Sequence, residues 1–300
     1  MFKIGKLFHL THVVDDLDAV DRWYDEVFSV TRFYRGYEKL AGREASLIAI
    51  GDVVMEPMMP ARVPELRNQS VKKFHDRFGQ HFHSIAWYVD DVGGLASRLD
   101  GEGLRLFNLV GRQIKPPNPA AAIWTHPKET SGQLEFALVG NYTIDPRLQP
   151  AWSGSFWRER HPLGIERSSH ITVVLRDLPG GKRLYCDILG GRLIHEAERP
   201  GRSRSAFVAI GDDTVIELAQ PLAIDTPEGR EIERNGEGIY ALVFKTRALE
   251  QAAEFLQSKG LRPEPDGASS IVLGGAQAFG MTIAFTDRNL PNDPRAQTVD

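Results

Sequence analysis

The chain has 300 residues, of which 42% are hydrophobic and 25% are charged, a composition typical of folded domains and unlike that of disordered segments. The net charge of −4 argues against a dedicated nucleic-acid binder, which normally carries a basic excess. The single cysteine, Cys186, excludes an internal disulfide and a cysteine-based metal cluster. No apolar run reaches the ~18 residues of a membrane span, and the first residues lack a signal-peptide pattern. We therefore expect a cytoplasmic protein that binds neither nucleic acid nor a membrane.

The most informative feature of the sequence is an internal repeat. Segment 9–17 reads His-Leu-Thr-His-Val-Val-Asp-Asp-Leu, and segment 170–178 reads His-Ile-Thr-Val-Val-Leu-Arg-Asp-Leu. One constant offset separates four pairs of landmark residues: His9 and His170, Asp16 and Asp177, Tyr24 and Tyr185, and Glu56 and Glu217. Segments 85–105 and 242–262 form a second, weaker pair. The chain therefore consists of four modules in the order A, B, A′ and B′.

Each module predicts the same succession of elements. An apolar strand opens it, and the four opening strands are expected at 8–14, 82–89, 169–175 and 239–244. A polar turn follows, and then a helix with apolar residues at intervals of three and four. Three short strands, broken by Gly and Pro, complete the module. The pattern β-α-β-β-β, repeated four times, predicts an α+β fold with antiparallel or mixed sheets. A doubly wound parallel sheet is disfavoured, because no glycine-rich phosphate loop precedes a helix.

The predicted division of the chain follows the repeat. Residues 1–142 are expected to form a first domain and residues 168–290 a second. The linker, 143–167, is rich in Pro and Gly and has few periodic apolar positions. Residues 291–300 are expected to form a tail.

Three sequence segments resemble those of the vicinal oxygen chelate superfamily, which includes glyoxalase, methylmalonyl-CoA epimerase, extradiol dioxygenases and bleomycin-resistance proteins. Segment 9–17 resembles the first strand and turn of that superfamily, and Gly-Asp-Asp-Thr-Val-Ile-Glu-Leu at 211–218 resembles its fourth strand. Segment 126–136, which begins His-Pro-Lys-Glu-Thr-Ser-Gly, is similar to the last strand of the epimerase-like branch. The resemblance implies that two modules curl into an open barrel around one divalent metal, with ligands from the first and fourth strands.

In the first half, the resemblance places the ligand positions on His9, Glu56 and Glu135. The fourth position falls on Ser84, which is no histidine. His83 is the neighbouring residue, and it would face the other side of the sheet unless a bulge shifts the register. A carboxylate within an apolar strand is costly unless it is paired or coordinated, which supports Glu56 and Glu135 as ligands.

In the second half, the equivalent positions keep only His170 and Glu217, because Ala241 and Ala284 occupy the other two. We expect one metal site, in the first domain. His170 and Glu217 are then either a second half-site or a relic of duplication. A barrel that pairs A′ with B is an alternative, with a site made of His170, Glu217 and Glu135.

One histidine with two carboxylates favours a divalent ion such as Mn, Fe, Co, Ni or Zn. The leading expectation is an enzyme that binds a small organic carbonyl substrate and moves a proton beside the carbonyl, as an isomerase, epimerase or lyase. Glu135 is the expected catalytic base, and His126 and Lys128 are expected to contact an anionic substrate. Segment 61–81 is either a lid over the site or a solvated excursion.

Two alternatives remain open. An iron-dependent extradiol dioxygenase would need two histidines and one carboxylate, and therefore His83 as a ligand. A metal-free binding or resistance protein would need no metal at all. The sequence leaves open which substrate is bound and whether the chain forms a homo-oligomer.

Overall fold

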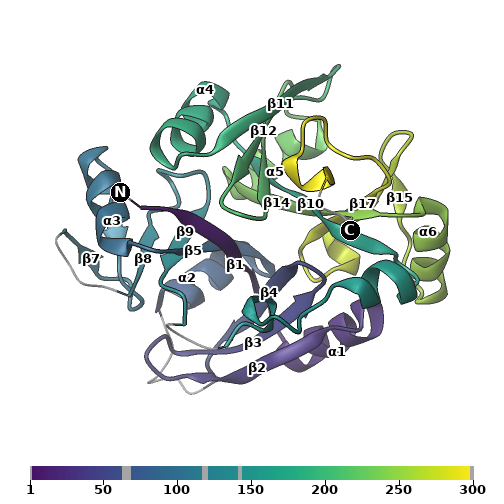
Figure 1. Cartoon of the computed structure of the whole chain (residues 1–300), viewed down its shortest axis with the longest axis horizontal. Helices are drawn as coiled ribbons and strands as arrows, with labels where there is room; N and C mark the ends of the chain where they lie inside the picture. Colours follow the sequence, from purple (N-terminus) through teal and green to yellow (C-terminus); the bar gives the residue numbers. More distant parts are fainter. Residues whose placement is uncertain (1, 63–68, 117–120, 141–143, 298–300) are drawn as a thin grey trace.

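The computed structural model describes residues 2–62, 69–116, 121–140 and 144–297. Over these ranges each half of the chain forms one mixed sheet with helices packed against it (Figure 1). The first sheet has the strand order β2-β3-β4-β1-β5-β9-β8-β6-β7, and the second has β11-β12-β13-β10-β14-β17-β16-β15. The predicted α+β class with four β-α-β-β-β modules is confirmed.

The first half contains the following helices and strands: β1 (Ile4–Val13), α1 (Leu17–Phe28), β2 (Thr31–Glu38), β3 (Arg43–Ile50), β4 (Val53–Pro60), α2 (Gln69–Phe78), β5 (His81–Val89), α3 (Val92–Gly101), β6 (Leu106–Phe107), β7 (Gln113–Ile114), β8 (Ala122–Thr125) and β9 (Gln133–Ala137). The second half contains β10 (Ile165–Val174), α4 (Leu178–Lys182), β11 (Arg192–Arg199), β12 (Ser203–Ile210), β13 (Thr214–Pro221), α5 (Pro227–Asn235), β14 (Gly238–Thr246), α6 (Leu249–Ser258), β15 (Glu264–Pro265), β16 (Ser270–Leu273) and β17 (Thr282–Thr286). None of the described helices is long and apolar enough to cross a membrane.

The opening strands of the modules lie at the centre of each sheet. β1 pairs antiparallel with β5, and β10 pairs antiparallel with β14. The fourth strand of each module lies parallel to its own first strand, as β4 does to β1 and β9 does to β5. Module A therefore shares a sheet with B, and A′ shares one with B′. This topology brings first-strand and fourth-strand residues of two modules onto neighbouring strands.

Helix α1 follows the pattern read from the sequence. The side chain of Asp16 accepts a hydrogen bond from the backbone N–H of Ala19 and caps the first turn. The helix ends at Phe28, and the capping residue that follows, Ser29, has a left-handed φ of 49°. Its apolar stripe is buried against the sheets, and includes Leu17, Val20, Tyr24, Val27 and Phe28. Equivalent aspartate caps start α3 and α4.

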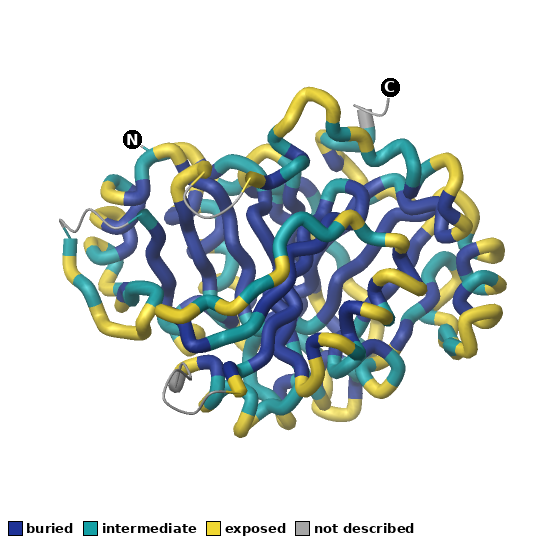
Figure 2. Tube along the Cα trace, turned by 90° about the horizontal axis from the view of Figure 1, so that it is seen from below, coloured by how far each residue is buried: buried dark blue, intermediate teal, exposed yellow. Residues whose placement is uncertain are grey.

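One hydrophobic core joins the two halves. The ring of Phe28 lies 5.7 Å from that of Phe244 and 6.4 Å from that of Phe285. Trp157, from the segment between the sheets, donates its indole N–H to the Phe28 carbonyl at 2.7 Å. Figure 2 shows the buried strands of both sheets running through the middle of the molecule.

His12 is part of this contact between the halves. It is fully buried, and its Nε2 donates to the backbone carbonyl of Phe279 at 2.7 Å. Its Nδ1 lies 3.4 Å from the hydroxyl of Tyr24. Burial lowers the pKa of His12 to about 3, so the folded chain holds this imidazole neutral.

The burial of His12 predicts a loss of stability in acid. The unfolded chain protonates this histidine near pH 6.5, whereas the folded chain does so only near pH 3. Between these values the unfolded state binds more protons, so the free energy of unfolding falls as the pH falls, by about 1.4 kcal/mol per pH unit. We expect His12→Gln, which keeps an N–H donor, to show a shallower decline than the parent between pH 6.5 and 4 in urea unfolding. Equal slopes for the two proteins would contradict the assignment.

A short Asp-Pro-Arg segment closes over each sheet. Arg147 donates to the backbone carbonyls of Leu7, Phe8 and Asp52, and its guanidinium pairs with Asp145 at 2.6 Å. In the second half, Asp293-Pro-Arg295 repeats the arrangement: Arg295 donates to the carbonyls of Ser169 and Asp213 and pairs with Asp293. The two segments fall in the predicted linker and tail, yet each arginine binds the first strand of its own half.

Candidate metal site

The register of four neighbouring strands, β4, β1, β5 and β9, assembles the predicted first-half ligands. In the parallel pair β1–β4, Thr11 lies opposite Glu56. In the antiparallel pair β1–β5, His9 lies opposite Ala86, which in turn lies opposite Glu135 in the parallel pair β5–β9. His9, Glu56 and Glu135 are therefore brought together from positions far apart in the sequence.

The three side chains converge on the imidazole of His9. Its Nε2 lies 3.3 Å from an oxygen of Glu56 and 3.3 Å from an oxygen of Glu135. All three residues are nearly inaccessible, with exposed fractions of 3%, 4% and 3% for His9, Glu56 and Glu135. We call this group the His9 cluster.

Neighbouring side chains orient the two carboxylates. Oε1 of Glu56 pairs with the guanidinium of Arg43 at 3.0 Å, and Oε2 accepts a hydrogen bond from Thr11 at 3.1 Å. Oε2 of Glu135 accepts the indole N–H of Trp124 at 2.9 Å. Sequence reasoning did not find Arg43 or Trp124. Trp124 lies directly opposite Glu135 in the β8–β9 hairpin, so a correct hairpin register would have indicated it.

The two carboxylates also set the charge of His9. Burial alone would lower its pKa, but the negative charges of Glu56 and Glu135 outweigh burial and raise the pKa above 6.5. Its other ring nitrogen, Nδ1, is buried and has no hydrogen-bond partner among the described residues.

A β-bulge places His83 beside the His9 cluster. In the β1–β5 pair, Leu10 lies opposite Ile85 and His12 opposite Phe82, so His83 and Ser84 both lie opposite the single residue between them. Ser84 donates to the hydroxyl of Thr11 at 2.9 Å.

The environment of His83 is apolar and cationic. Its Nδ1 is 3.2 Å from the Ser84 hydroxyl, and its ring packs edge-on against Phe74 at 4.7 Å. Burial, reinforced by Arg43, lowers its pKa to about 4. The bulge that the sequence required for His83 is thus present, and the residue lies next to the His9 cluster rather than within it.

The donor set of the His9 cluster fits a divalent ion in its chemistry. An imidazole nitrogen and carboxylate oxygens are donor types that divalent ions such as Mn, Fe, Co, Ni or Zn accept, and Nε2 of His9 lies 3.3 Å from an oxygen of each carboxylate. Among the described residues, no group of three or more His, Cys, Asp or Glu side chains is already spaced to enclose a metal. Holding an ion at this cluster therefore requires its side chains to readjust.

Comparisons with known proteins identify the superfamily of the chain. The model of the Glyoxalase/Bleomycin resistance protein/Dioxygenase superfamily matches residues 167–288. The uncharacterized protein YaeR of Escherichia coli is 30% identical over 103 residues, which cover 34% of this chain and 78% of YaeR. The uncharacterized protein YwkD of Bacillus subtilis is 29% identical over 97 residues, covering 32% of this chain and 73% of YwkD. The chain belongs to the glyoxalase/bleomycin resistance/dioxygenase superfamily.

A solved structure extends the likeness over both halves of this superfamily member. A mutant of 4-hydroxymandelate synthase from Streptomyces coelicolor superimposes with a TM-score of 0.70, covering 97% of this chain and 95% of that one. The identity is 11%, so this similarity is one of fold. The superfamily includes epimerases and dioxygenases, and its members commonly bind a divalent metal ion.

The second half of this superfamily member has only two of the donors. Nε2 of His170 lies 3.3 Å from an oxygen of Glu217. Both oxygens of Glu217 are already bonded, one by Ser205 at 2.7 Å and the other by Thr172 at 2.7 Å. The hydrogen bond and charge of His170 overcome burial and lower the pKa of Glu217.

A second cavity, of about 460 Å³, opens next to this pair. The buried alanines of the remaining two predicted positions, Ala241 and Ala284, line it and offer no ligand atom.

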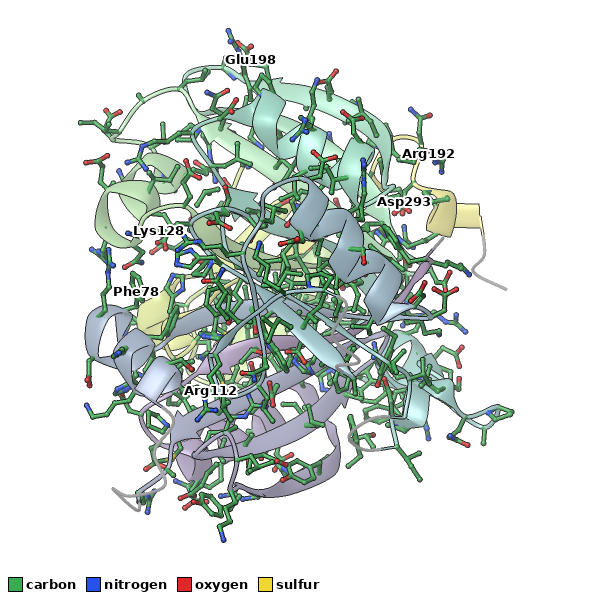
Figure 3. All side chains as sticks on the ribbon, turned by 90° about the vertical axis from the view of Figure 1, so that its left-hand side faces the viewer. Phe78, Arg112, Lys128, Arg192, Glu198 and Asp293 are labelled. Carbon is green, nitrogen blue, oxygen red and sulfur yellow. The ribbon has the colours of Figure 1, made fainter. Side chains whose placement is uncertain are left out.

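A larger cavity, of about 620 Å³, is lined by residues that contact the His9 cluster, but His9, Glu56 and Glu135 themselves are not part of its lining. Arg43, His83 and Trp124, which adjoin the His9 cluster, line it. The predicted substrate contacts His126 and Lys128 line it as well. Figure 3 shows Lys128 and Phe78, another lining residue, on the same side of the molecule.

Helix α2 forms part of the wall of this first-half cavity. The helix lies within segment 61–81, for which the sequence predicted either a lid or a surface excursion. Residues 63–68 of that segment lie outside the described residues.

Proposed function

We propose that this chain is a divalent-metal-dependent enzyme that transfers a proton beside a carbonyl group of a small organic substrate, as an isomerase, epimerase or lyase. The observation that carries the proposal is the His9 cluster, in which one imidazole and two carboxylates converge in a nearly dry region next to a 620 Å³ cavity. Glu56 already pairs with Arg43, but Glu135 forms no ion pair with a lysine or arginine that the structure describes, and a buried carboxylate without a cation is costly. Superfamily membership adds independent support for a metal.

Within this proposal, His9, Glu56 and Glu135 would hold the ion. A bound divalent ion supplies Lewis-acid stabilisation of negative charge on a substrate oxygen. Arg43 holds Oε1 of Glu56, and the opposite oxygen faces His9. Trp124, which lines the cavity, donates its indole N–H to Glu135, and Glu135 is the carboxylate that we expect to take and return the proton. The donor set is suited to Mn, Fe, Co, Ni or Zn.

The test begins with metal content. We expect elemental analysis of protein purified without chelator to give about one divalent metal per chain. The loaded protein is then incubated in D₂O with 2-oxo acids and branched acyl thioesters, and exchange of the hydrogen next to the carbonyl is followed by NMR. Glu135→Gln should keep the far-UV circular dichroism of the parent and lose exchange by about 100-fold, the usual size of a general-base effect.

The outcomes separate the alternatives. A metal-free protein that still binds small molecules would support the binding-protein function, and metal near two per chain would establish a working site at His170 and Glu217. Unchanged exchange and metal content in Glu135→Gln would remove Glu135 from the site.

The second candidate function is an iron-dependent extradiol dioxygenase. The observation that favours it is the bulge that sets His83 next to the His9 cluster. Oxygen consumption by the Fe²⁺-loaded protein with catechols, lost in His83→Ala, would support this chemistry over proton transfer.

A further inference from the structure

Most of the cationic side chains that line the first-half cavity have no anionic partner among the described residues. Four cationic side chains line it, and one of them, Arg43, pairs with Glu56. The other three, Lys73, Arg77 and Lys128, form no ion pair with a residue that the structure describes. Arg77 lies over the ring of Phe78 at 4.9 Å, which leaves its N–H groups available for a ligand.

The carboxylates of the same cavity are engaged elsewhere. Glu231 pairs with His81 at 2.7 Å and accepts from Asn235 at 2.7 Å. Glu237 accepts from the hydroxyl of Ser131 at 2.7 Å and from the backbone N–H of Arg176 at 2.9 Å. The ligand-facing surplus of charge is therefore positive.

Five aromatic side chains line the same cavity. Phe74 and Phe78 come from α2, Phe82 from β5, Phe107 from β6 and Trp124 from β8. Flat apolar rings of this kind select flat apolar bodies, because stacked and edge-on contacts then replace water over a large area. The volume of about 620 Å³ is within the range of small-molecule sites.

The second half of the chain closes this cavity. Helix α5 and the start of β14 supply Glu231 and residues 235–239 to its lining. The His81–Glu231 pair and the Ser131–Glu237 hydrogen bond join the halves across it. Both halves of the chain therefore line the cavity, although its lysine and arginine side chains all come from the first half.

We propose that the cavity binds an organic anion with a flat aromatic body, whose carboxylate or similar acidic group is held by Lys73, Arg77 and Lys128. The inference names the substrate class of the proposed enzyme and rests on that function only in placing the other end of the ligand toward the His9 cluster. The cations recognise charge, and the phenylalanines and Trp124 recognise the ring.

The test uses 2-naphthoate as the probe, followed by its own fluorescence in equilibrium titrations of the full chain. Its neutral methyl ester and the aliphatic anion hexanoate are the matched probes for charge and ring. We expect both to bind at least about tenfold more weakly than 2-naphthoate, as the loss of a charge-assisted contact or of ring burial implies. Added NaCl should weaken the binding of 2-naphthoate and leave the binding of the ester unchanged.

Variants on one helix supply the matched control. The double variant Lys73→Gln/Arg77→Gln should weaken 2-naphthoate about tenfold or more and leave the ester unaffected. Lys72→Gln is the control, because Lys72 lies beside Lys73 but pairs with Asp76 and does not line the cavity. Equal binding of acid and ester, or equal losses in the double variant and in Lys72→Gln, would overturn the inference.

Failure of this inference is distinguishable from failure of the proposed function. The titrations are repeated after chelator treatment and with His9→Ala, where charge-selective binding should persist without metal. Selective binding in a chain that takes up no metal would refute the proposed chemistry and keep the anion site. Metal uptake without selectivity for the acid would do the reverse.

Discussion

Replacing His9 with alanine is expected to abolish tight divalent-metal binding, whereas replacing His170 is expected to leave it intact. His9 lies 3.3 Å from both carboxylates of its cluster, so its loss leaves two buried anions and no nitrogen donor. A transition metal is held much less well by two carboxylates alone. His170 contacts a single carboxylate, Glu217, and the other two predicted ligand positions are Ala241 and Ala284, which offer no donor.

The measurement is metal stoichiometry and affinity by titration calorimetry on both variants and the parent. Each variant carries the same change at an equivalent position of the repeat, so the second serves as the control for the first. Far-UV circular dichroism checks that both remain folded. Metal lost with His170→Ala and kept with His9→Ala would move the site to the second half and refute the assignment.

Much of the fold could be predicted from the internal repeat. Residues that recur at a constant offset imply that the same strands occupy the same positions in both sheets. This holds for β1 and β10, each of which pairs antiparallel with the opening strand of the next module. The start of these strands was placed too late, at 8 and 169 instead of Ile4 and Ile165. The early residues are mixed with glycine and charged side chains, which hide the apolar alternation although they still pair with the neighbouring strand.

The parts that could not be predicted depend on register and on contacts across the halves. The bulge at His83 arises from the pairing of β1 with β5, and the sequence of either strand alone does not indicate it. Arg43 lies opposite Pro60 in the β3–β4 pair, so even a correct register would not have indicated its ion pair with Glu56. Helix α5 contributes to the first-half cavity because the two halves pack against each other, and the hydrophobic pattern of each half does not indicate which surfaces meet.

Arg147→Ala is expected to destabilise the folded chain strongly. The side chain of Arg147 is 2% exposed, and that of its partner Asp145 is fully buried. Removing the guanidinium leaves a buried carboxylate unpaired and the carbonyls of Leu7, Phe8 and Asp52 without their donor. Breaking a buried pair of this kind costs about 3–5 kcal/mol. Urea unfolding at pH 7 measures the change.

Two controls bear on that loss. Asp145→Ala combined with Arg147→Ala should recover part of the stability, because the unpaired carboxylate is then gone. Arg295→Ala removes the equivalent contact of the second half and should cost less, since the side chain of Arg295 is 12% exposed and water can replace part of its bonding. A double variant no more stable than Arg147→Ala would show that the carbonyl contacts, and not the charge, dominate.

Arg147→Ala should also weaken metal binding at the His9 cluster. Arg147 holds the backbone carbonyls of Leu7 and Phe8, the two residues that precede His9 on β1. Without that contact the strand start is free to shift, and a ligand set that depends on the position of His9 should bind its ion more weakly. Arg295 holds the residue before His170 in the same way, but Arg295→Ala should leave the metal affinity unchanged, because the second half lacks the remaining donors. Calorimetric titration of both variants measures this. Equal metal affinities in parent and Arg147→Ala would show that β1 is held in place without Arg147.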